Sequence, residues 1–317
     1  MNKVNLIGKV ENFFLKNLSN CRLCPRQCNV NRLEGSFGFC KHTGENVLVA
    51  TVCDHHGEEP VISGSKGSGT IFFSHCNLEC SYCQNHQISK NTFNNPPAHE
   101  MSIEQLKDQM LKLQSKGCHN INLVTPTHFV AHIILALKKA YKQGLKIPIV
   151  YNCGGYEDID VIKALEGIVD IFLPDFKYSD ESLAQKHSHC NNYFSNAKLV
   201  MKELFRQTNG QLKLDSDNVA IEGLIIRHLI LPGEIENSKN ILKFLASELS
   251  NQLSVSLMSQ YNPPQNALIN RPLKSSEYEE ITNYLLSLGF DNGWLQDMDS
   301  KDTYNIDFEQ NLGSLFL

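Results

Sequence analysis

The sequence contains no long hydrophobic run. No uninterrupted apolar stretch approaches the roughly 20 residues of a membrane-spanning helix. The first twenty residues are interrupted by Lys3, Lys9, Glu11 and Lys16, so they lack the apolar segment of a secretory signal peptide. These two absences predict a cytoplasmic protein without a membrane partner.

An excess of positive charge is also missing. The 29 Lys and Arg residues are outnumbered by 34 Asp and Glu residues, and the net charge is −5. Because this balance leaves no global electrostatic footprint for nucleic acid, we expect no nucleic-acid partner. The 317 residues, of which 41% are hydrophobic and 20% charged, have the composition of a globular protein with a substantial core.

Cysteine, by contrast, is abundant, with 11 residues. In a chain without an export signal, cysteines are more typical of metal binding or catalysis than of disulfides. The odd number agrees, because it excludes complete pairing. The composition therefore predicts a soluble metalloprotein.

Three of the cysteines directly follow the apolar run at residues 69–73. Cys76, Cys80 and Cys83 have C-x3-C-x2-C spacing. Three such thiolates can wrap one [4Fe-4S] cluster and leave its fourth iron open to a small molecule. Structural zinc normally has four closed protein ligands, so it fits this spacing poorly. The spacing also matches one face of a helix, but the preceding strand signal and polar neighbours such as Asn77 favour a metal-binding loop.

A second group of cysteines lies nearer the N-terminus. Cys21, Cys24, Cys28 and Cys40 have C-x2-C-x3-C-x11-C spacing, and the glycines between the last two permit tight turns. Four thiolates suit either zinc or an auxiliary iron–sulfur cluster. Unliganded cysteines in a small loop are an alternative. A zinc-ribbon-like nucleic-acid module is disfavoured, because a second C-x2-C pair and a dense basic surface are missing.

Strand and helix patterns alternate through most of the chain. An amphipathic helix is predicted within residues 1–20 and a first strand at 47–53, and the later strands are predicted at 69–74, 121–125, 147–151, 169–173, 223–231 and 253–258. Helices are predicted at about 103–116, 129–143, 158–167, 180–205, 236–250 and 275–288, with a polar insertion at 206–221. Six strand–helix units predict an α/β protein with a parallel sheet, and too few units for a complete eight-stranded barrel.

Polar residues gather at the C-terminal ends of these strands, where barrel-type enzymes build their active sites. Asp175 and Lys177 point the same way from an extended backbone and form a pair of opposite charges. Asn152 precedes two glycines that either permit close approach of a ligand or make a tight turn. Arg227, on its strand, is a candidate for carboxylate binding or a structural ion pair. The segment 54–60 is more typical of a polar turn than of a site, although it lies just before the cysteine loop.

The stretch C-x3-C-x-Y-C-Q-N resembles the cluster loop of the radical S-adenosylmethionine (SAM) superfamily. In that superfamily the amino and carboxylate groups of SAM chelate the open iron of a [4Fe-4S] cluster, and the residue matching Tyr82 packs near the adenine. The resemblance implies a partial (β/α)6 barrel at residues 61–296. Residues 1–60 are then a small cysteine-rich extension and residues 297–317 a C-terminal tail.

Other segments resemble uncharacterised proteins similar to pyruvate formate-lyase activating enzyme. In that enzyme a D-x-K segment matching Asp175 and Lys177 contacts SAM, and the R-x-x-x-x-P-G segment matches Arg227. Tyr261 lies near the position of a histidine that touches the adenosyl group. The Gly-Gly-Glu that holds the SAM amino group in many members is replaced here by the segment at 125–128.

The resemblance implies an oxidoreductase that cleaves SAM reductively to a 5′-deoxyadenosyl radical, with an electron from flavodoxin or ferredoxin. The named candidate within this class is activation of a glycyl radical enzyme, and other radical reactions on small molecules or proteins are equally compatible. The alternative from another class is a non-catalytic iron–sulfur electron-transfer protein. Such a carrier is expected to close its cluster with a fourth cysteine.

Overall fold

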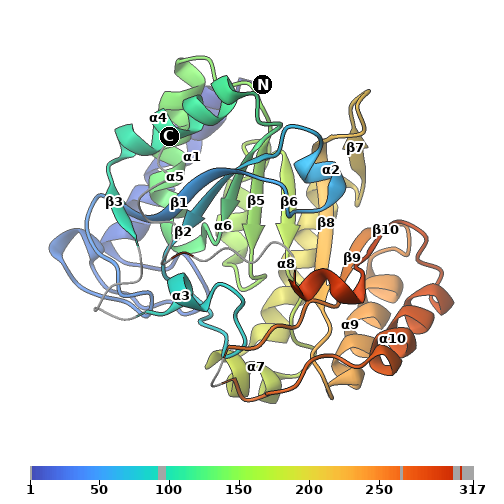
Figure 1. Cartoon of the computed structure of the whole chain (residues 1–317). Coiled ribbons are helices and arrows are strands. Elements are labelled where there is room, and N and C mark those ends of the chain that lie inside the picture. Colours follow the sequence, from blue (N-terminus) through green and yellow to red (C-terminus); the bar gives the residue numbers. More distant parts are fainter. Residues whose placement is uncertain (1, 92–97, 265–266, 303–307, 309–317) are drawn as a thin grey trace.

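The computed structural model describes residues 2–91, 98–264, 267–302 and 308, which are organised around one mixed β-sheet (Figure 1). Along the sheet the strand order is β10-β9-β8-β6-β5-β4-β2-β1-β3, and β7 pairs with β8. The strands are β1 (Val47–His55), β2 (Ser68–Phe73), β3 (His99–Met101), β4 (Ile121–Val124), β5 (Ile149–Cys153), β6 (Ile171–Pro174), β7 (Leu212–Leu214), β8 (Ala220–Leu229), β9 (Ser254–Met258) and β10 (Gly293–Leu295).

The six strands predicted from residue 69 onward are confirmed, and they pair in parallel in the order β2, β4, β5, β6, β8 and β9. β10 adds a further parallel strand, whereas β1 pairs antiparallel with both β2 and β3. The path of strands ends at β10 and β3, so the sheet is open, as predicted for an incomplete barrel. β2, β4, β5 and β6 are buried along their whole length, which is typical of parallel strands covered on both faces.

Helices cover the sheet, with α1, α4 and α5 at the end near β3 and with α9 and α10 at the end near β10 (Figure 1). α1 and α4 pack on α5, α6 packs on α8, and α9 packs on α10. The helices are α1 (Lys3–Ser19), α2 (Pro60–Ser63), α3 (His86–Ser89), α4 (Ile103–Lys116), α5 (Val130–Lys142), α6 (Ile159–Ala164), α7 (Glu181–Ser188), α8 (Tyr193–Thr208), α9 (Ile235–Glu248) and α10 (Ser275–Ser287), with 3-10 turns η1 (Arg32–Glu34), η2 (Thr127–Phe129) and η3 (Met298–Asp302).

Local sequence explains most helix ends, with one correction. Ser102 begins α4 with a capping box, in which its hydroxyl accepts from Gln105 N at 3.3 Å and the Gln105 side chain accepts from Ser102 N at 2.9 Å. The single helix predicted at 180–205 is wrong, because the chain turns between α7 and α8. His189 and Asn192 have left-handed backbones there, with φ of 47° and 56°, and this conformation ends a right-handed helix.

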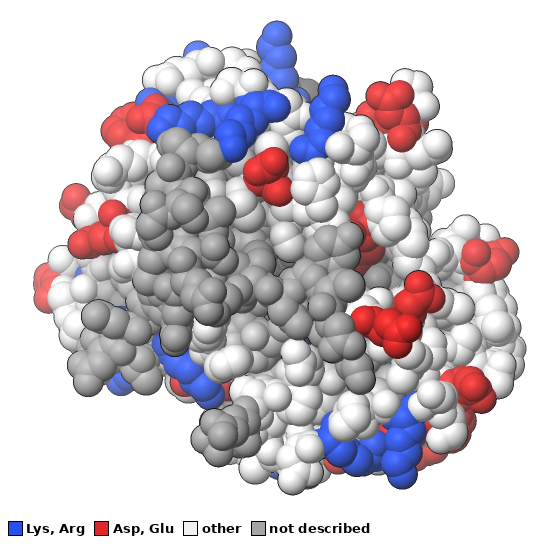
Figure 2. Space-filling model, in the orientation of Figure 1, with Lys and Arg blue, Asp and Glu red and all other residues white. Residues whose placement is uncertain are grey.

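Two surface features bear on partners. None of the helices formed by the described residues combines the length and apolar character needed to cross a membrane. On the face shown in Figure 2, basic side chains gather along the upper edge and again at the lower right, and acidic side chains are scattered between them.

Candidate functional site

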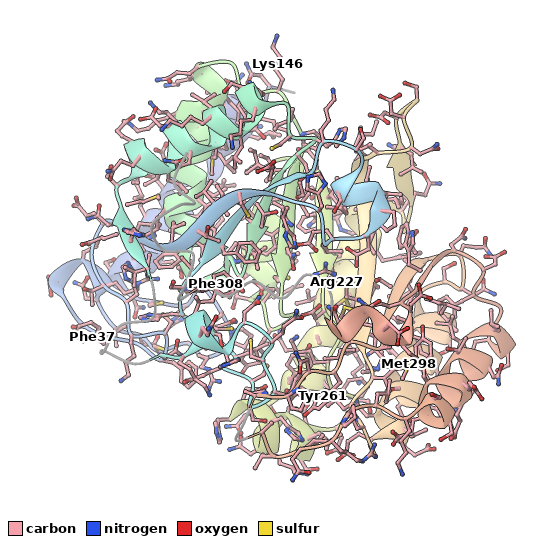
Figure 3. All side chains as sticks on the ribbon, viewed as in Figure 1. Phe37, Lys146, Arg227, Tyr261, Met298 and Phe308 are labelled. Carbon is pink, nitrogen blue, oxygen red and sulfur yellow. The ribbon has the colours of Figure 1, made fainter. Side chains whose placement is uncertain are left out.

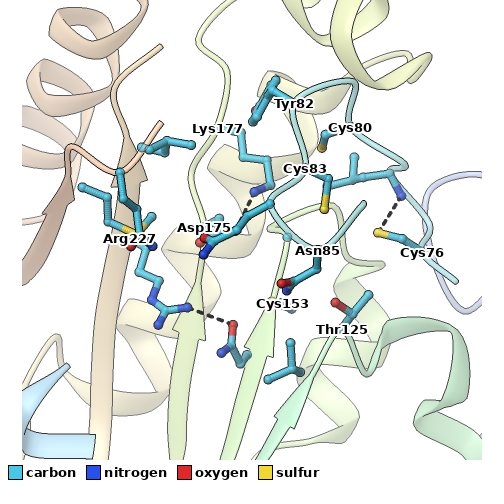
Figure 4. Close-up of a pocket in the computed structure, with 18 of the residues that line it drawn as sticks. Cys76, Cys80, Tyr82, Cys83, Asn85, Thr125, Cys153, Asp175, Lys177 and Arg227 are labelled. Atoms are coloured by element: carbon cyan, nitrogen blue, oxygen red, sulfur yellow. Dashed lines mark hydrogen bonds and ion pairs between the residues drawn. The ribbon is translucent and has the colours of Figure 1, made fainter. Parts of the chain in front are cut away.

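A cavity lies where the parallel strands end, beside the loop that follows β2 (Figure 4). Asn152 lies at the end of β5, Asp175 and Lys177 follow β6, and Arg227 lies on β8. Eight of the nine residues predicted for the SAM-type site line this cavity: Cys76, Cys80, Tyr82, Cys83, Asn152, Asp175, Lys177 and Arg227.

The segment with the three cysteines is a loop rather than a helix, as predicted. His75 and Glu79, which immediately precede Cys76 and Cys80, have left-handed backbones with φ of 68° and 54°. This conformation is uncommon for residues other than glycine and clusters at functional sites. Asn91 fixes the loop from outside, since its side chain donates to Cys76 O at 2.8 Å and accepts from Cys76 N at 3.0 Å.

Hydrogen-bond donors surround the cysteine sulfurs, of which that of Cys80 belongs to a buried residue and those of Cys76 and Cys83 to partly buried ones. Leu78 N donates to Cys76 Sγ at 3.3 Å, and Ser188 Oγ donates to Cys80 Sγ at 3.0 Å. Burial, reinforced by the neighbouring Cys80, raises the pKa of the Cys76 thiol to about 12. Because a thiol must lose its proton to bind a metal, binding at these cysteines is coupled to proton release.

Four cysteines line the cavity, three of them in the loop after β2. Among the described residues, no three His, Cys, Asp or Glu side chains converge on a point that would hold one metal ion. In a [4Fe-4S] cluster each thiolate binds a different iron, so three ligands around a cavity need not converge in this way. Cys153 also lines the cavity, from the end of β5, and its thiol bonds the carboxyl group of Glu157.

Asp175 and Lys177 form an ion pair at the cavity wall, with 2.6 Å between Lys177 Nζ and Asp175 Oδ2. The backbone holds both residues, because Asp175 N donates to Cys153 O at 2.8 Å and Lys177 N donates to Tyr193 Oη at 2.9 Å. Burial opposes the charge on Lys177, but Asp175, helped by Cys80 and Cys83, holds the pKa of Lys177 above its ordinary value. The cavity wall therefore presents both signs of charge beside the cysteines.

Arg227 is neutralised by two carboxylates that the sequence analysis did not assign to a site. Its Nε and Nη2 lie 2.8 Å and 3.1 Å from the two carboxylate oxygens of Glu59, and Nη2 also pairs with Glu58. Glu58 also accepts from the side chains of Asn122 at 2.9 Å and Asn152 at 3.3 Å. Burial alone would raise the pKa of Glu59, yet the guanidinium of Arg227 holds it below the ordinary value.

The segment 54–60 is therefore more than a polar turn. His55, Gly57 and Glu58 line the cavity, and Glu59 lies directly behind them. The Glu-Glu-Pro motif and the Gly-Ser-rich stretch after it could have indicated from the sequence that this segment belongs to the site. They do not indicate that Arg227 is the partner of the two glutamates. The two glutamates lie 168 and 169 residues before Arg227 in the chain, so only the folded sheet brings them together.

Tyr261 is the ninth predicted residue, and it lies behind the cavity wall. Its hydroxyl donates to Ile269 O at 2.9 Å, and its ring centroid is 5.9 Å from that of Tyr82. Figure 3 shows Tyr261 below Arg227, on the segment after β9. Its neighbours Gln260 and Asn262 line the cavity instead. Tyr261 thus supports Tyr82, which does reach the cavity.

The segment that replaces the Gly-Gly-Glu motif reaches the cavity through one residue. Thr125, at the end of β4, lines the cavity with a left-handed φ of 60°. Thr127 turns away and donates to Glu157 Oε1 at 2.7 Å, and His128 is buried with its Nε2 2.8 Å from Ser74 O. Glu157 is another buried group missed in the sequence, and burial raises its pKa to about 7.

The four N-terminal cysteines form a separate group, and none of them lines the cavity. Burial raises the pKa of Cys24, and the nearby Cys40 and Cys21 add to this effect, so these thiols lie close enough to repel one another as thiolates. Cys21 and Cys28 act on Cys40 in the same way. Cys28 Sγ accepts from Phe39 N at 3.4 Å.

Comparison with known proteins defines the class. A family model described as "Radical SAM superfamily" matches residues 70–245. An uncharacterised protein of Methanocaldococcus jannaschii, MJ0674, is 32% identical over 297 residues, covering 89% of this chain and 78% of that protein. The chain belongs to the radical SAM superfamily.

Two solved structures are similar to this chain, and the first of them shares its fold. The crystal structure of a radical SAM methyltransferase from Sphaerobacter thermophilus has a TM-score of 0.50 at 14% identity, over 72% of this chain and 65% of that one. Streptococcus suis SuiB bound to the precursor peptide SuiA has a TM-score of 0.47 at 11% identity, over 76% of this chain and 52% of that one. This chain thus spans less than two thirds of either protein.

Superfamily membership makes the chain an enzyme that uses a [4Fe-4S] cluster and SAM. The site has groups of the kind that these cofactors need: three cysteines at one cavity wall and both signs of charge beside them. SAM carries an amino group, a carboxylate and an adenine. The cavity offers a carboxylate, an ammonium group and the ring of Tyr82 as partners of matching chemistry.

Proposed function

We propose that this protein is an oxidoreductase that activates a glycyl radical enzyme and resembles pyruvate formate-lyase activating enzyme. The observation that carries the proposal is the placement of the Asp175–Lys177 ion pair on the same cavity as Cys76, Cys80 and Cys83. The D-x-K segment and the Arg227 segment are the features that resemble the activating enzyme. A flavodoxin or ferredoxin is the proposed electron donor.

When bound, the cluster and SAM supply an electron transfer that yields methionine and a 5′-deoxyadenosyl radical. Cys76, Cys80 and Cys83 hold the cluster. Lys177 and Asp175 orient the carboxylate and amino groups of the methionine part, and Asn152 adds polar contacts. Tyr82, supported from behind by Tyr261, packs beside the adenine. The buried wall excludes water from the reactive centre.

Arg227 has a modified role in this proposal. Its guanidinium is already neutralised by Glu58 and Glu59, so a SAM carboxylate would compete with two protein carboxylates for it. Nη1 contacts Asn152 Oδ1 at 3.3 Å, and it is the part of the guanidinium turned toward the polar residues of β5. Arg227 therefore positions Asn152 and shapes the cavity, and it contacts SAM through this edge.

We further propose that Cys21, Cys24, Cys28 and Cys40 bind a second metal group. Their mutual proximity supports the site, because thiols that raise one another's pKa gain from a shared cation. Residues 61–296 then form the catalytic core, and the extension at 1–60 contributes Glu58 and Glu59 to it.

The first experiment measures 5′-deoxyadenosine made from SAM by anaerobically reconstituted, dithionite-reduced protein. The wild type is expected to form it and Cys80→Ala is not. Should a cluster-loaded wild type form none and SAM leave the EPR signal of the reduced cluster unchanged, the electron-transfer alternative takes its place.

The substrate class is tested separately, with pyruvate formate-lyase as the probe. The radical is expected to abstract hydrogen from a glycine of this partner and leave a glycyl radical visible by EPR. With α-deuterated glycine in the partner, one deuterium appears in the 5′-deoxyadenosine. If 5′-deoxyadenosine forms without deuterium and no glycyl radical appears, the protein cleaves SAM but pyruvate formate-lyase is not its substrate.

A further inference from the structure

A fully buried arginine lies beside the N-terminal cysteines. Arg32, in η1, is 1% exposed. Its Nη1 donates to His128 O at 2.7 Å, whereas Nε and Nη2 are buried without a hydrogen-bond partner among the described residues. Within the same residues, no carboxylate lies within ion-pair distance of Arg32. A buried charge and two unpaired donors are both costly, so this arrangement points to a missing acceptor with negative charge.

The side chains around Arg32 identify where that charge can reside. His42, His128 and His132 are its electrostatic neighbours, and a histidine has no negative charge in either protonation state. Cys40 is another neighbour, and Arg32 favours its charged thiolate against the effect of burial. The guanidinium therefore lies close enough to Cys40 to stabilise a thiolate there, and Cys40 belongs to a group of four thiols on which negative charge can accumulate.

We propose that Cys21, Cys24, Cys28 and Cys40 hold a [4Fe-4S] cluster, and that its negative charge compensates buried Arg32. The inference rests on the second metal site of the proposed function and assigns its chemical class. Four thiolates give either zinc or a cluster a net negative charge. A cluster also has inorganic sulfides, which can accept hydrogen bonds, and so offers Nε and Nη2 more acceptors than the four thiolates of a zinc site alone.

The backbone of the N-terminal group supports a cluster rather than one ion. Gln27, with φ of 41°, immediately precedes Cys28, and Glu79, with φ of 54°, immediately precedes Cys80. Each is the last residue between two cysteines of a C-x3-C segment, so the chain makes the same left-handed turn in both loops. As in the catalytic loop, no three N-terminal thiols converge on a single-ion site among the described residues.

The two cysteine groups also share a wall. Arg26 donates to Asn77 O at 2.8 Å and to Ser188 O at 2.9 Å, and so contacts both the catalytic loop and the residue that bonds Cys80. On the other side, Cys40 O lies 2.8 Å from His75 Nδ1. In Figure 1 the loop after α1 lies beside the loop that precedes α3. The proposed second cluster is therefore a close neighbour of the catalytic one.

The test isolates the N-terminal site by replacing Cys76, Cys80 and Cys83 with alanine. Anaerobically purified and reconstituted, this variant is expected to hold about four iron and four sulfide ions per chain. Reduction should give an EPR signal that SAM does not change. Adding Cys21→Ser and Cys24→Ser to this variant should remove both the bound iron and sulfide and the EPR signal. One zinc ion without iron, or no bound metal, would overturn the proposal. Since this variant cannot cleave SAM, the result is independent of the radical reaction.

The role of Arg32 is tested in the same variant. Arg32→Gln should shift the midpoint potential of the cluster to more negative values, because the reduced, more negative cluster is no longer stabilised by a nearby positive charge. Arg32→Lys should shift it less, and Arg22→Gln, at an exposed residue of the same loop, should not shift it. An unchanged potential in a cluster-loaded Arg32→Gln protein would overturn the charge role. If Arg32→Gln loses its iron, retention of iron by Arg32→Lys supports the role, and loss of iron by both overturns it.

Discussion

The hydroxyl of Ser188, at the end of α7, donates a 3.0 Å hydrogen bond to Cys80 Sγ. Tyr178 holds the hydroxyl in place, with its own oxygen 2.6 Å from Ser188 Oγ. Hydrogen bonds to cluster sulfurs are one of the means by which a protein sets the reduction potential of the cluster. Ser188, which is not among the residues that line the cavity, is thus placed to tune the proposed cluster at Cys80.

Ser188→Ala is expected to lower the midpoint potential of the catalytic cluster. Removing the donor destabilises the reduced, more negative cluster relative to the oxidised one. The measurement is a redox titration followed by EPR, with iron content as the check on loading. Ser182→Ala, at an exposed residue of the same helix, is the control. An unchanged potential in fully loaded Ser188→Ala protein would contradict the prediction.

The ion pair at the cavity wall leads to a prediction on SAM affinity. Lys177→Met and Asp175→Asn are each expected to weaken SAM binding about 10- to 100-fold, the effect of losing about 1.5–3 kcal/mol from a hydrogen bond to a charged group. The quantity measured is the SAM dependence of the EPR change in the reduced cluster. Lys213→Met removes one partner of an exposed 3.0 Å ion pair with Glu222 and should leave the affinity unchanged. Wild-type affinity in both cavity variants would remove the pair from the SAM site.

The buried ion pairs of Arg227 lead to a prediction on stability. Glu59→Gln removes one carboxylate from a buried guanidinium and is expected to cost about 3 kcal/mol, because the charge on Arg227 loses part of its compensation. The readout is the Tm of the anaerobic, cluster-loaded protein. Glu277→Gln provides a matched comparison, since its partner Arg271 is 37% exposed, and its effect should be smaller. Equal decreases in Tm for the two variants would show that burial does not increase the contribution of the Arg227 pairs to stability.

Features set by short-range patterns could be predicted from the sequence. The cluster loop follows from the spacing of Cys76, Cys80 and Cys83, and the order of parallel strands follows from the alternation of strand and helix patterns. Asp175 and Lys177 were expected to point the same way, and they share one cavity wall, because one extended backbone presents both side chains to the same face. In each case the information lies within a few neighbouring residues.

Features that depend on distant contacts were missed or misplaced. The Glu58 and Glu59 segment resembles a polar turn until β8 brings Arg227 to it. Arg32 is singled out by no sequence pattern, and its burial appears only when the loop packs against His128. The position of Tyr261 behind Tyr82 likewise depends on how the chain leaves β9. Sequence spacing contains no information about these approaches.

Glu157 leads to a prediction on pH dependence. It is fully buried and accepts from Thr127 and Tyr151, and burial raises its pKa from 4.5 to about 7. The folded protein therefore binds this proton more tightly than the unfolded chain. The stability from the neutral carboxyl is fully present below pH 4.5 and is lost as the pH rises toward 7, by about 3 kcal/mol in total. Glu157→Gln has no such titration, so its Tm should exceed that of the wild type at pH 8 but not at pH 5. Glu166→Gln, at an exposed residue, is the control and should show no such pH dependence. If the Tm difference between Glu157→Gln and the wild type is equal at pH 5 and pH 8, the prediction of a buried titrating carboxyl group is contradicted.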